Sequence, residues 1–289
     1  MYVHAPSCYR EHIPSAPFHN SLASMSNSVT TALFDSHLPL AQQLDQVKEA
    51  IRSDPSKASL RTFYFQLLAV LGDWTKALAQ LQVCAQLDPK ALPMAQAYRE
   101  AMRCETLRAE VFAGTRTPYI MGEPPEWLSY MVDALKAQAE SSAQAACELR
   151  ARALEMAPAI SGAINAEAFE WLCDSDSRLG PIFEFYTNGC YYWIPYSALR
   201  SVVLEKPQDL RDVIWQPAEL TLVNESTLRG LAPARYPLHA EDDDGLKLGR
   251  RTEWTELGEE HVAGRGQKVL VTDQGDHAVL DVRTISFNV

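Results

Sequence analysis

The sequence predicts an α+β protein in which a tetratricopeptide-like helical domain precedes a mostly β domain. Apolar residues recur at helical spacing up to about residue 155, and short apolar runs of strand length follow from about residue 160. The Asn188-Gly189 step between two such runs is typical of a β-hairpin. We therefore expect a disordered tail or start-site extension (1–29), a helical domain (30–160) and a β domain (161–289).

The first 24 residues lack apolar periodicity and are rich in Pro, His and Ser. A composition of this kind does not predict a packed element. We expect the segment to be a tail or an extension upstream of the true start. Met25 is then a candidate start site, and the folded region is expected to begin near Thr30.

Apolar stripes at spacings of three and four residues predict the first three helices, over 40–53, 58–71 and 74–87. Gly72 suits the C-terminal cap of the second helix, because glycine adopts left-handed backbone without strain. Asp73 suits the N-terminal cap of the third helix, where a carboxylate accepts from free backbone N–H groups. The two helices are therefore expected to form a hairpin.

Two Asp-Pro pairs, Asp54-Pro55 and Asp88-Pro89, lie 34 residues apart, which is the tetratricopeptide period. Each pair is expected to end a helix, since a residue before proline disfavours helical backbone. A longer helix over 91–112 breaks the repeat, and two more helices begin, one at Pro125 and one capped by Ser141 or Ser142. An ordinary helical bundle with coincidental spacing is the alternative.

Beyond residue 160 the pattern predicts strands, over 182–186, 190–194, 201–205, 219–223, 268–272 and 278–287. A short helix is expected over 209–215, and Gly275 is expected to mark a turn. The first half of the polar segment 239–260 reads as a mobile surface loop, in which Asp242-Asp243-Asp244 would be solvated.

The net charge of the chain disfavours some classes of binding partner. It has 289 residues, with 26 Lys and Arg against 37 Asp and Glu, so the formal net charge is −11. Phosphate backbones and anionic membrane surfaces repel such a chain, so we expect neither nucleic acid nor membrane as a partner. No apolar run reaches the roughly 20 residues of a membrane span, and no signal peptide is recognisable.

The six cysteines form no CxxC pair, which favours free thiols in the cytoplasm and no metal.

Motifs that carry catalysis are missing from the sequence, including GxSxG, a Walker loop and HExxH. We therefore expect no enzyme, no catalytic residues and no cofactor. Asp174 and Asp176 resemble half of a calcium loop, but the later acidic ligand is missing, so local turns are favoured. A hydrolase hidden in the β domain is an alternative, which would need His239, His261 or His277 to converge with other groups.

Two sets of residues are candidates for partner binding. In a tetratricopeptide unit the first helix lines the concave side, and the small or polar residues on that side of 58–71 are Ser59, Thr62, Gln66 and Ala69. Plain solvent exposure explains the same pattern. The second set is Tyr191 and Trp193, which share one face of a strand that is apolar on both faces. Packing in the core is the alternative for these aromatic residues.

A series of short segments runs in order through residues 33–289. They are Gly72–Ala77 (GDWTKA), Leu87–Pro89 (LDP), Leu92–Gln96 (LPMAQ), Val111–Gly114 (VFAG), Gly122–Trp127 (GEPPEW), Asp174–Pro181 (DSDSRLGP), Asn188–Pro195 (NGCYYWIP), Asp209–Asp212 (DLRD), Arg235–Pro237 (RYP), Arg250–Trp254 (RRTEW) and Leu280–Arg283 (LDVR). Taken together they resemble the ImpE family, also called TagJ, an accessory component of bacterial type VI secretion. One departure is Cys190, where the family pattern suggests an Arg or a similar residue.

The resemblance implies a non-enzymatic cytoplasmic adaptor. Members of the family associate with the N-terminal helix of the small subunit of the contractile sheath. They are also linked to the AAA+ ATPase that disassembles the contracted sheath. A generic cytosolic scaffold or chaperone for another secretion component is the alternative with the same fold.

Overall fold

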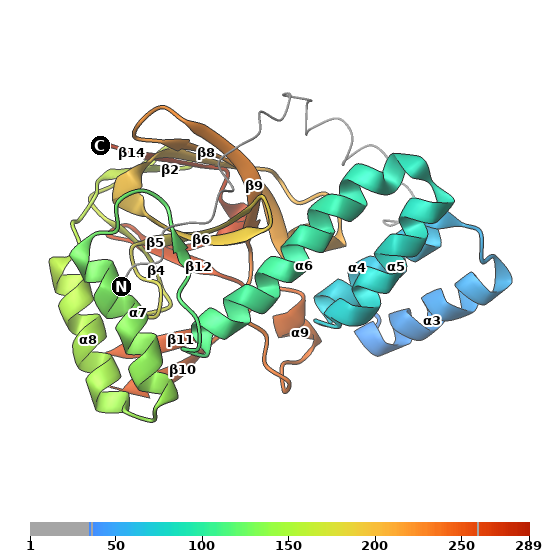
Figure 1. Ribbon diagram of the computed structural model, residues 1–289, viewed down its shortest axis with the longest axis horizontal. Helices are drawn as coiled ribbons and strands as arrows, with labels where there is room; N and C mark the ends of the chain where they lie inside the picture. Colours follow the sequence, from blue (N-terminus) through green and yellow to red (C-terminus); the bar gives the residue numbers. More distant parts are fainter. Residues whose placement is uncertain (1–34, 36, 259) are drawn as a thin grey trace.

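A computed structural model describes residues 35, 37–258 and 260–289 of the chain. The expected tail and the candidate start at Met25 lie outside the described residues. Helices predominate from Leu40 to Met156 and strands predominate from Gly162 onward, so the predicted α+β class is confirmed. Figure 1 shows α6 crossing the molecule, with α3, α4 and α5 at one end of it and α7 and α8 at the other.

The first helices follow the predicted order as α3 (Leu40–Ser53), α4 (Ala58–Val70), α5 (Trp74–Leu87) and α6 (Leu92–Phe112). Gly72 has a φ of +77° just after α4. The side chain of Asp73 accepts a hydrogen bond from Lys76 N at the start of α5. Asp54 ends α3, and Asp88 ends α5 before the 3-10 turn Pro89–Ala91. The expected helical hairpin of α4 and α5 is therefore confirmed, with its caps.

A second hairpin is formed by α7 (Glu126–Ala139) and α8 (Ala143–Met156), which begin after Pro125 and Ser142 as predicted. The loop between α6 and α7 contains the two-residue strand β1 (Tyr119–Ile120). This strand pairs in parallel with β6. Two residues are too few to leave a periodic signal in a sequence.

The largest sheet has nine strands in the order β1-β6-β5-β9-β8-β7-β14-β2-β3. Its strands after β1 are β2 (Gly162–Ile164), β3 (Glu167–Phe169), β5 (Ile182–Thr187), β6 (Cys190–Pro195), β7 (Leu199–Leu204), β8 (Trp215–Leu222), β9 (Thr227–Pro233) and β14 (Thr284–Phe287). Strands β5 and β6 form the hairpin predicted at Asn188-Gly189, with Thr187 opposite Cys190. Near β8, the expected short helix is a 3-10 turn, η3 (Leu210–Val213).

Two smaller sheets complete the fold: β10-β11 and β13-β12-β4. Their strands are β4 (Leu172–Asp174), β10 (Thr252–Gly258), β11 (His261–Gly266), β12 (Val269–Thr272) and β13 (Gly275–Ala278). The single strand expected over 278–287 is wrong. The chain makes a 3-10 turn over Val279–Asp281, which buries Val279 and separates β13 from β14.

The solvated loop expected at Asp242-Asp243-Asp244 is wrong for Asp242, whereas Asp243 is exposed as expected. Asp243 caps the short helix α9 (Asp244–Lys247) by accepting from Leu246 N at 3.0 Å. Asp242 is buried and pairs with Arg265. All three carboxylates have tertiary or capping partners, since Asp244 accepts from Leu40 N at 2.8 Å.

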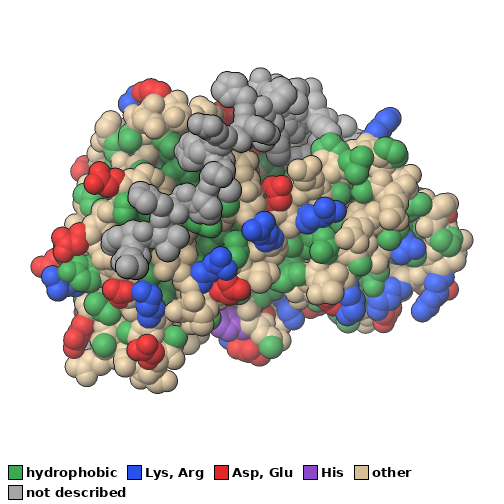
Figure 2. Space-filling model, viewed as in Figure 1, with side chains coloured by type: hydrophobic (Ala, Val, Ile, Leu, Met, Phe, Trp, Pro, Cys, Tyr) green, Lys and Arg blue, Asp and Glu red, His purple; other side chains and the backbone are tan. Residues whose placement is uncertain are grey.

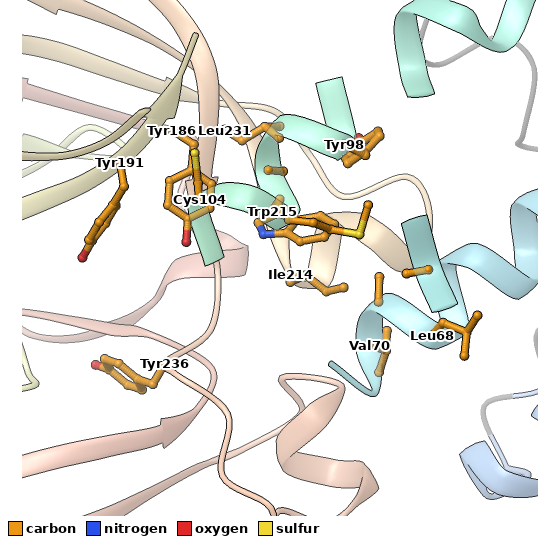
Figure 3. Packing of buried hydrophobic residues seen from close by; sticks show 14 of the residues in the cluster. Leu68, Val70, Tyr98, Cys104, Tyr186, Tyr191, Ile214, Trp215, Leu231 and Tyr236 are labelled. Atoms are coloured by element: carbon orange, nitrogen blue, oxygen red, sulfur yellow. The ribbon is translucent and has the colours of Figure 1, made fainter. Parts of the chain in front are cut away.

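The inner side of the helical array is packed against the strands. Trp215 at the start of β8 lies 5.7 Å, between ring centroids, from both Trp74 of α5 and Tyr98 of α6. Figure 3 shows Trp215 between Tyr98 and the end of α4, where Val70 lies. One hydrophobic cluster therefore includes residues of α3 to α7 and one face of the large sheet. A second cluster fills the opposite side of that sheet.

Candidate interaction site

A pocket of about 290 Å³ opens where the helices meet the β region. Leu71 and Trp74 line it from the α4–α5 turn, Glu105 and Arg108 from α6, and segment 235–240 from the chain after β9. A Cβ atom on Gly72 would lie 2.8 Å from Leu238 Cδ1. Glycine is favoured at this turn by its positive φ, whereas the contact with Leu238 involves the end of a flexible side chain that can shift.

A buried ionic cluster lies beside this pocket. Arg108 Nε and Nη2 donate to the two carboxylate oxygens of Glu184 on β5, at 2.7 and 2.8 Å. Lys268 Nζ also donates to Glu184 and lies 2.8 Å from Asp174 Oδ2. Tyr191 OH donates to Glu184 at 2.6 Å. The cluster thus joins α6, β5, β6 and the start of β12 through one carboxylate.

The ionisation of the cluster follows from its partners. Burial disfavours the charged form of Glu184, but Arg108 and Lys268 outweigh this cost and lower its pKa. Burial has the larger effect at Asp174, whose pKa is raised despite the nearby Lys268. Arg108, Glu184 and Asp174 are all almost fully buried. The buried carboxylates and cations of the cluster form ion pairs with one another. The cluster therefore stabilises the junction and presents no charged group to a substrate.

Glu105 and Arg235 make further links between the two halves. Glu105 accepts from Tyr186 OH at 3.0 Å and from Trp215 Nε1 at 2.8 Å. Arg235 donates to Ala69 O at 3.1 Å and to Val70 O at 2.8 Å. The last carbonyls of a helix have no partner inside it, so Arg235 acts as a tertiary cap of α4. Burial lowers the pKa of Arg235 to about 10.

The four residues predicted on α4 differ in accessibility. Ser59 and Thr62 are half-buried, and Thr62 Oγ1 lies 3.7 Å from Cys84 Sγ on α5. Gln66 and Ala69 are fully buried, on a helix that packs against η3. Partner binding by this set stays a prediction, and only Ser59 and Thr62 are partly accessible in the structure.

Tyr191 and Trp193 lie on one face of β6, as their spacing predicts, and both are buried. Trp193 Nε1 donates to Tyr191 OH at 2.6 Å. The opposite face of β6, with Ile194, packs into the second hydrophobic cluster. Both faces of the strand are therefore covered in this structure, and binding of a partner by Tyr191 and Trp193 stays a prediction.

Groups with catalytic or metal-binding potential were also located. Asp174 and Asp176 form the predicted local turn, since Asp176 N donates to Asp174 Oδ1 at 2.9 Å. Within residues 35, 37–258 and 260–289, no group of three or more His, Cys, Asp or Glu residues could hold a metal ion. His261 contacts the backbone oxygen of Cys147, and His277 contacts Thr272 within its own hairpin. In the described part of the chain these contacts do not form a nucleophile–base–acid set.

The sequence did not identify the buried cluster as a unit. Arg108 sits in a helix whose apolar stripe predicts only packing, and Glu184 interrupts an apolar strand by one residue. This acidic residue within an apolar strand was the one indication of a buried ion pair in the sequence, because a buried carboxylate is stable only when a cation pairs with it. Its partners Arg108 and Lys268 are 76 and 84 residues away, so no local spacing could reveal them.

None of the helices in the described residues has the length and apolar character needed to cross a bilayer.

Comparison with known proteins places these features in a family. The family model described as "ImpE protein" matches residues 166–286. The type VI secretion system accessory component TagJ of Pseudomonas aeruginosa is 48% identical over 249 residues, which is 86% of this chain and 87% of that protein. The crystal structure of protein VPA1032 from Vibrio parahaemolyticus matches with a TM-score of 0.78 and 25% identity, covering 86% of this chain and 93% of that chain. At such identity and coverage, the chain belongs to the ImpE/TagJ family of type VI secretion accessory components.

Proposed function

We propose that the protein is a non-enzymatic cytoplasmic adaptor of type VI secretion that binds the N-terminal helix of the small sheath subunit. The observation that carries the proposal is the 48% identity to TagJ over 86% of the chain. The helices α3 to α6 support it, because helical arrays of this kind commonly bind other proteins by accepting a helix.

The proposed binding is tested with purified proteins. The full chain is immobilised and exposed to the small sheath subunit with and without its N-terminal helix. The intact subunit should be retained and the truncated one should not. Equal retention of both forms would exclude the helix as the binding element.

Two surfaces are separated by substitutions that add bulk at partly or fully exposed residues. Thr62→Arg enlarges the accessible part of the α4 set, and Ala240→Trp obstructs the exposed side of the junction pocket. Ala143→Trp, at the exposed start of α8, is the matched control. If the helix docks on α4, only Thr62→Arg should weaken retention, by at least about tenfold, or about 1.4 kcal/mol.

We further propose a link to the AAA+ ATPase that disassembles the contracted sheath. An adaptor held on the small sheath subunit would lie on the substrate of that ATPase. Adding the protein to contracted sheaths and ATPase should change the rate of disassembly, followed by light scattering. An unchanged rate at saturating protein would contradict the link while leaving sheath binding intact.

A further inference from the structure

Strand β10 has one backbone edge that the fold does not use. In the β10-β11 sheet, Arg251 O accepts from Gln267 N at 3.0 Å, just before the strands begin. Along an antiparallel ladder, hydrogen-bonded pairs alternate with pairs that are not hydrogen-bonded. Because Arg251 and Gln267 form a hydrogen-bonded pair, the next pair, Thr252 and Gly266, is not hydrogen-bonded, and the same holds for Trp254 and Gly264. The N–H and C=O groups of Thr252, Trp254 and Glu256 therefore point away from β11.

The opposite edge of the same sheet is fully occupied. The outward groups of β11 bind other segments at 2.9 to 3.0 Å: Val262 with Ser177, Gly264 with Asp176, and Gly266 with Tyr236. These contacts fall on alternate residues, which agrees with the alternation inferred for β10. Across residues 37–258 and 260–289, the outward backbone groups of Thr252, Trp254 and Glu256 have no corresponding partner.

The free edge is exposed rather than covered. Residues 253–256 are exposed, and 43% of Trp254 is accessible although its ring packs edge-on against Tyr236. Proteins usually protect such edges with Pro, Lys or a bulge. A bulge between Glu256 and Gly258 and a hydrogen bond from Cys147 Sγ to Leu257 O protect only the end of β10. Its first five residues contain neither Pro nor Lys.

The charge along this edge is acidic. Glu253 is partly neutralised by Arg251, which also pairs with Asp243. Glu256 forms no ion pair with any residue in the described ranges, and exposed Glu260 follows in the turn. A strand added here would therefore lie beside carboxylates, which favours a basic occupant over an acidic one.

We propose that β10 binds an extended, basic segment of a partner protein as an added strand. Three N–H and three C=O groups on alternate residues supply the main-chain hydrogen bonds of such an addition. Trp254 supplies exposed aromatic surface next to them, and Glu253 and Glu256 select for Lys or Arg. This mode is independent of the docking of a sheath helix, so either proposal can fail without the other.

The test is a calorimetric titration of the full chain with the peptide acetyl-Lys-Val-Lys-Val-Lys-Val-Lys-amide. Glu256→Pro removes one outward N–H without removing a bond to β11, and should weaken binding at least about tenfold. Glu256→Gln keeps that N–H and should weaken binding by only about two- to threefold. The peptide acetyl-Glu-Val-Glu-Val-Glu-Val-Glu-amide should not bind at the same concentrations.

Other results would overturn the proposal. Equal binding by wild type and Glu256→Pro would show charge attraction without strand addition. No binding of the basic peptide at about 1 mM, a free energy weaker than about −4 kcal/mol, would leave the edge without this function. Self-association that is lost in Glu256→Pro would make a second copy the occupant. If Glu256→Pro does not fold by circular dichroism, the basic peptide N-methylated at alternate residues replaces that variant, and it should bind the wild type at least about tenfold more weakly because it lacks main-chain donors at the same charge.

Discussion

Glu184 receives hydrogen bonds from three side chains on three different elements: Arg108, Tyr191 and Lys268. Its carboxylate is buried, so its charge is tolerated only because two cations contact it. Loss of this one group would leave buried Arg108 without its main partner and would leave Lys268 with Asp174 as its remaining carboxylate partner.

We expect Glu184→Ala to lower the free energy of unfolding by about 3–5 kcal/mol, the cost of breaking a buried ion pair from one side. Urea denaturation followed by circular dichroism measures it. Glu219→Ala is the matched control, because Glu219 pairs with Arg229 at the surface and should cost less than about 1 kcal/mol. Similar losses in the two variants would contradict the assigned role of Glu184.

His261 is the described histidine whose titration is tied to packing. Its Nε2 lies 3.2 Å from Cys147 O, and its Nδ1 is buried without a hydrogen-bond partner among the described residues. Burial lowers its pKa, and the charge of buried Arg150 lowers it further, against smaller opposite effects of the hydrogen bond to Cys147 O and of Glu260. The unfolded chain therefore binds a proton at this residue more readily than the folded chain does.

Because the folded pKa lies below the unfolded value of about 6.5, stability should fall as the pH drops below about 6.5 and level off below the folded pKa. We expect the free energy of unfolding of His261→Gln to depend less on pH than that of the wild type. Denaturation at pH values from about 7.5 to about 5 compares them. Parallel curves for the two proteins would assign the acid sensitivity to other groups.

At the scale of elements, the ends of helices carry much of the specificity. Gly72 and Asp73 end α4 and begin α5 by local chemistry that the sequence displays. The other carbonyls at the end of α4 are satisfied by Arg235, which is 165 residues from Val70. The end of α4 is thus stabilised both by residues next to it in the sequence and by a tertiary contact from Arg235.

Asp73→Ala should lower the free energy of unfolding by about 1 kcal/mol, because the free N–H of Lys76 loses its acceptor. Asp45→Ala in α3 provides the control, since Asp45 is exposed, caps no helix and should change stability by less than about 0.5 kcal/mol. Thermal unfolding of both variants distinguishes a cap from a surface charge. A cost at Asp45 equal to that at Asp73 would contradict the capping role.

At the scale of the whole molecule, the helical array and the large sheet share one hydrophobic cluster. Trp215 bridges α5 and α6 from the sheet side, while Trp193 lies on β6 among the residues that face α6. Figure 2 shows hydrophobic side chains dispersed among polar and charged ones on the face in view. Trp193 and Trp215 of the β region thus stabilise the junction between the two halves.

Trp193→Ala should therefore lower the free energy of unfolding by about 3–5 kcal/mol, through lost packing and a cavity at the junction. Trp171→Ala, at a residue with 37% exposure, should cost much less. Retention of the small sheath subunit by folded Trp193→Ala protein is measured alongside stability. Full stability with at least tenfold weaker retention would instead place Trp193 in a partner-binding surface.

The sequence by itself determined the α+β class, the helix boundaries at Asp54, Gly72, Asp73 and Asp88, and the hairpin at Asn188-Gly189. These features depend on backbone preferences and apolar periodicity within a few residues, so a short stretch of sequence is enough to predict them. The segments that resemble the ImpE family also lay in the sequence, and the comparison with TagJ confirmed the family.

Only the tertiary structure decided which of the candidate residues are accessible. Gln66 and Ala69 have the polarity or size of a groove residue, yet both are fully buried in a helix that packs against η3. Asp242 has the pattern of a solvated loop, yet Arg265 holds it in the interior. The Glu184 cluster and the free edge of β10 depend on which distant segments meet, or fail to meet, a given strand. Contacts between residues this far apart in the chain depend on how all the elements pack, which local spacing does not encode.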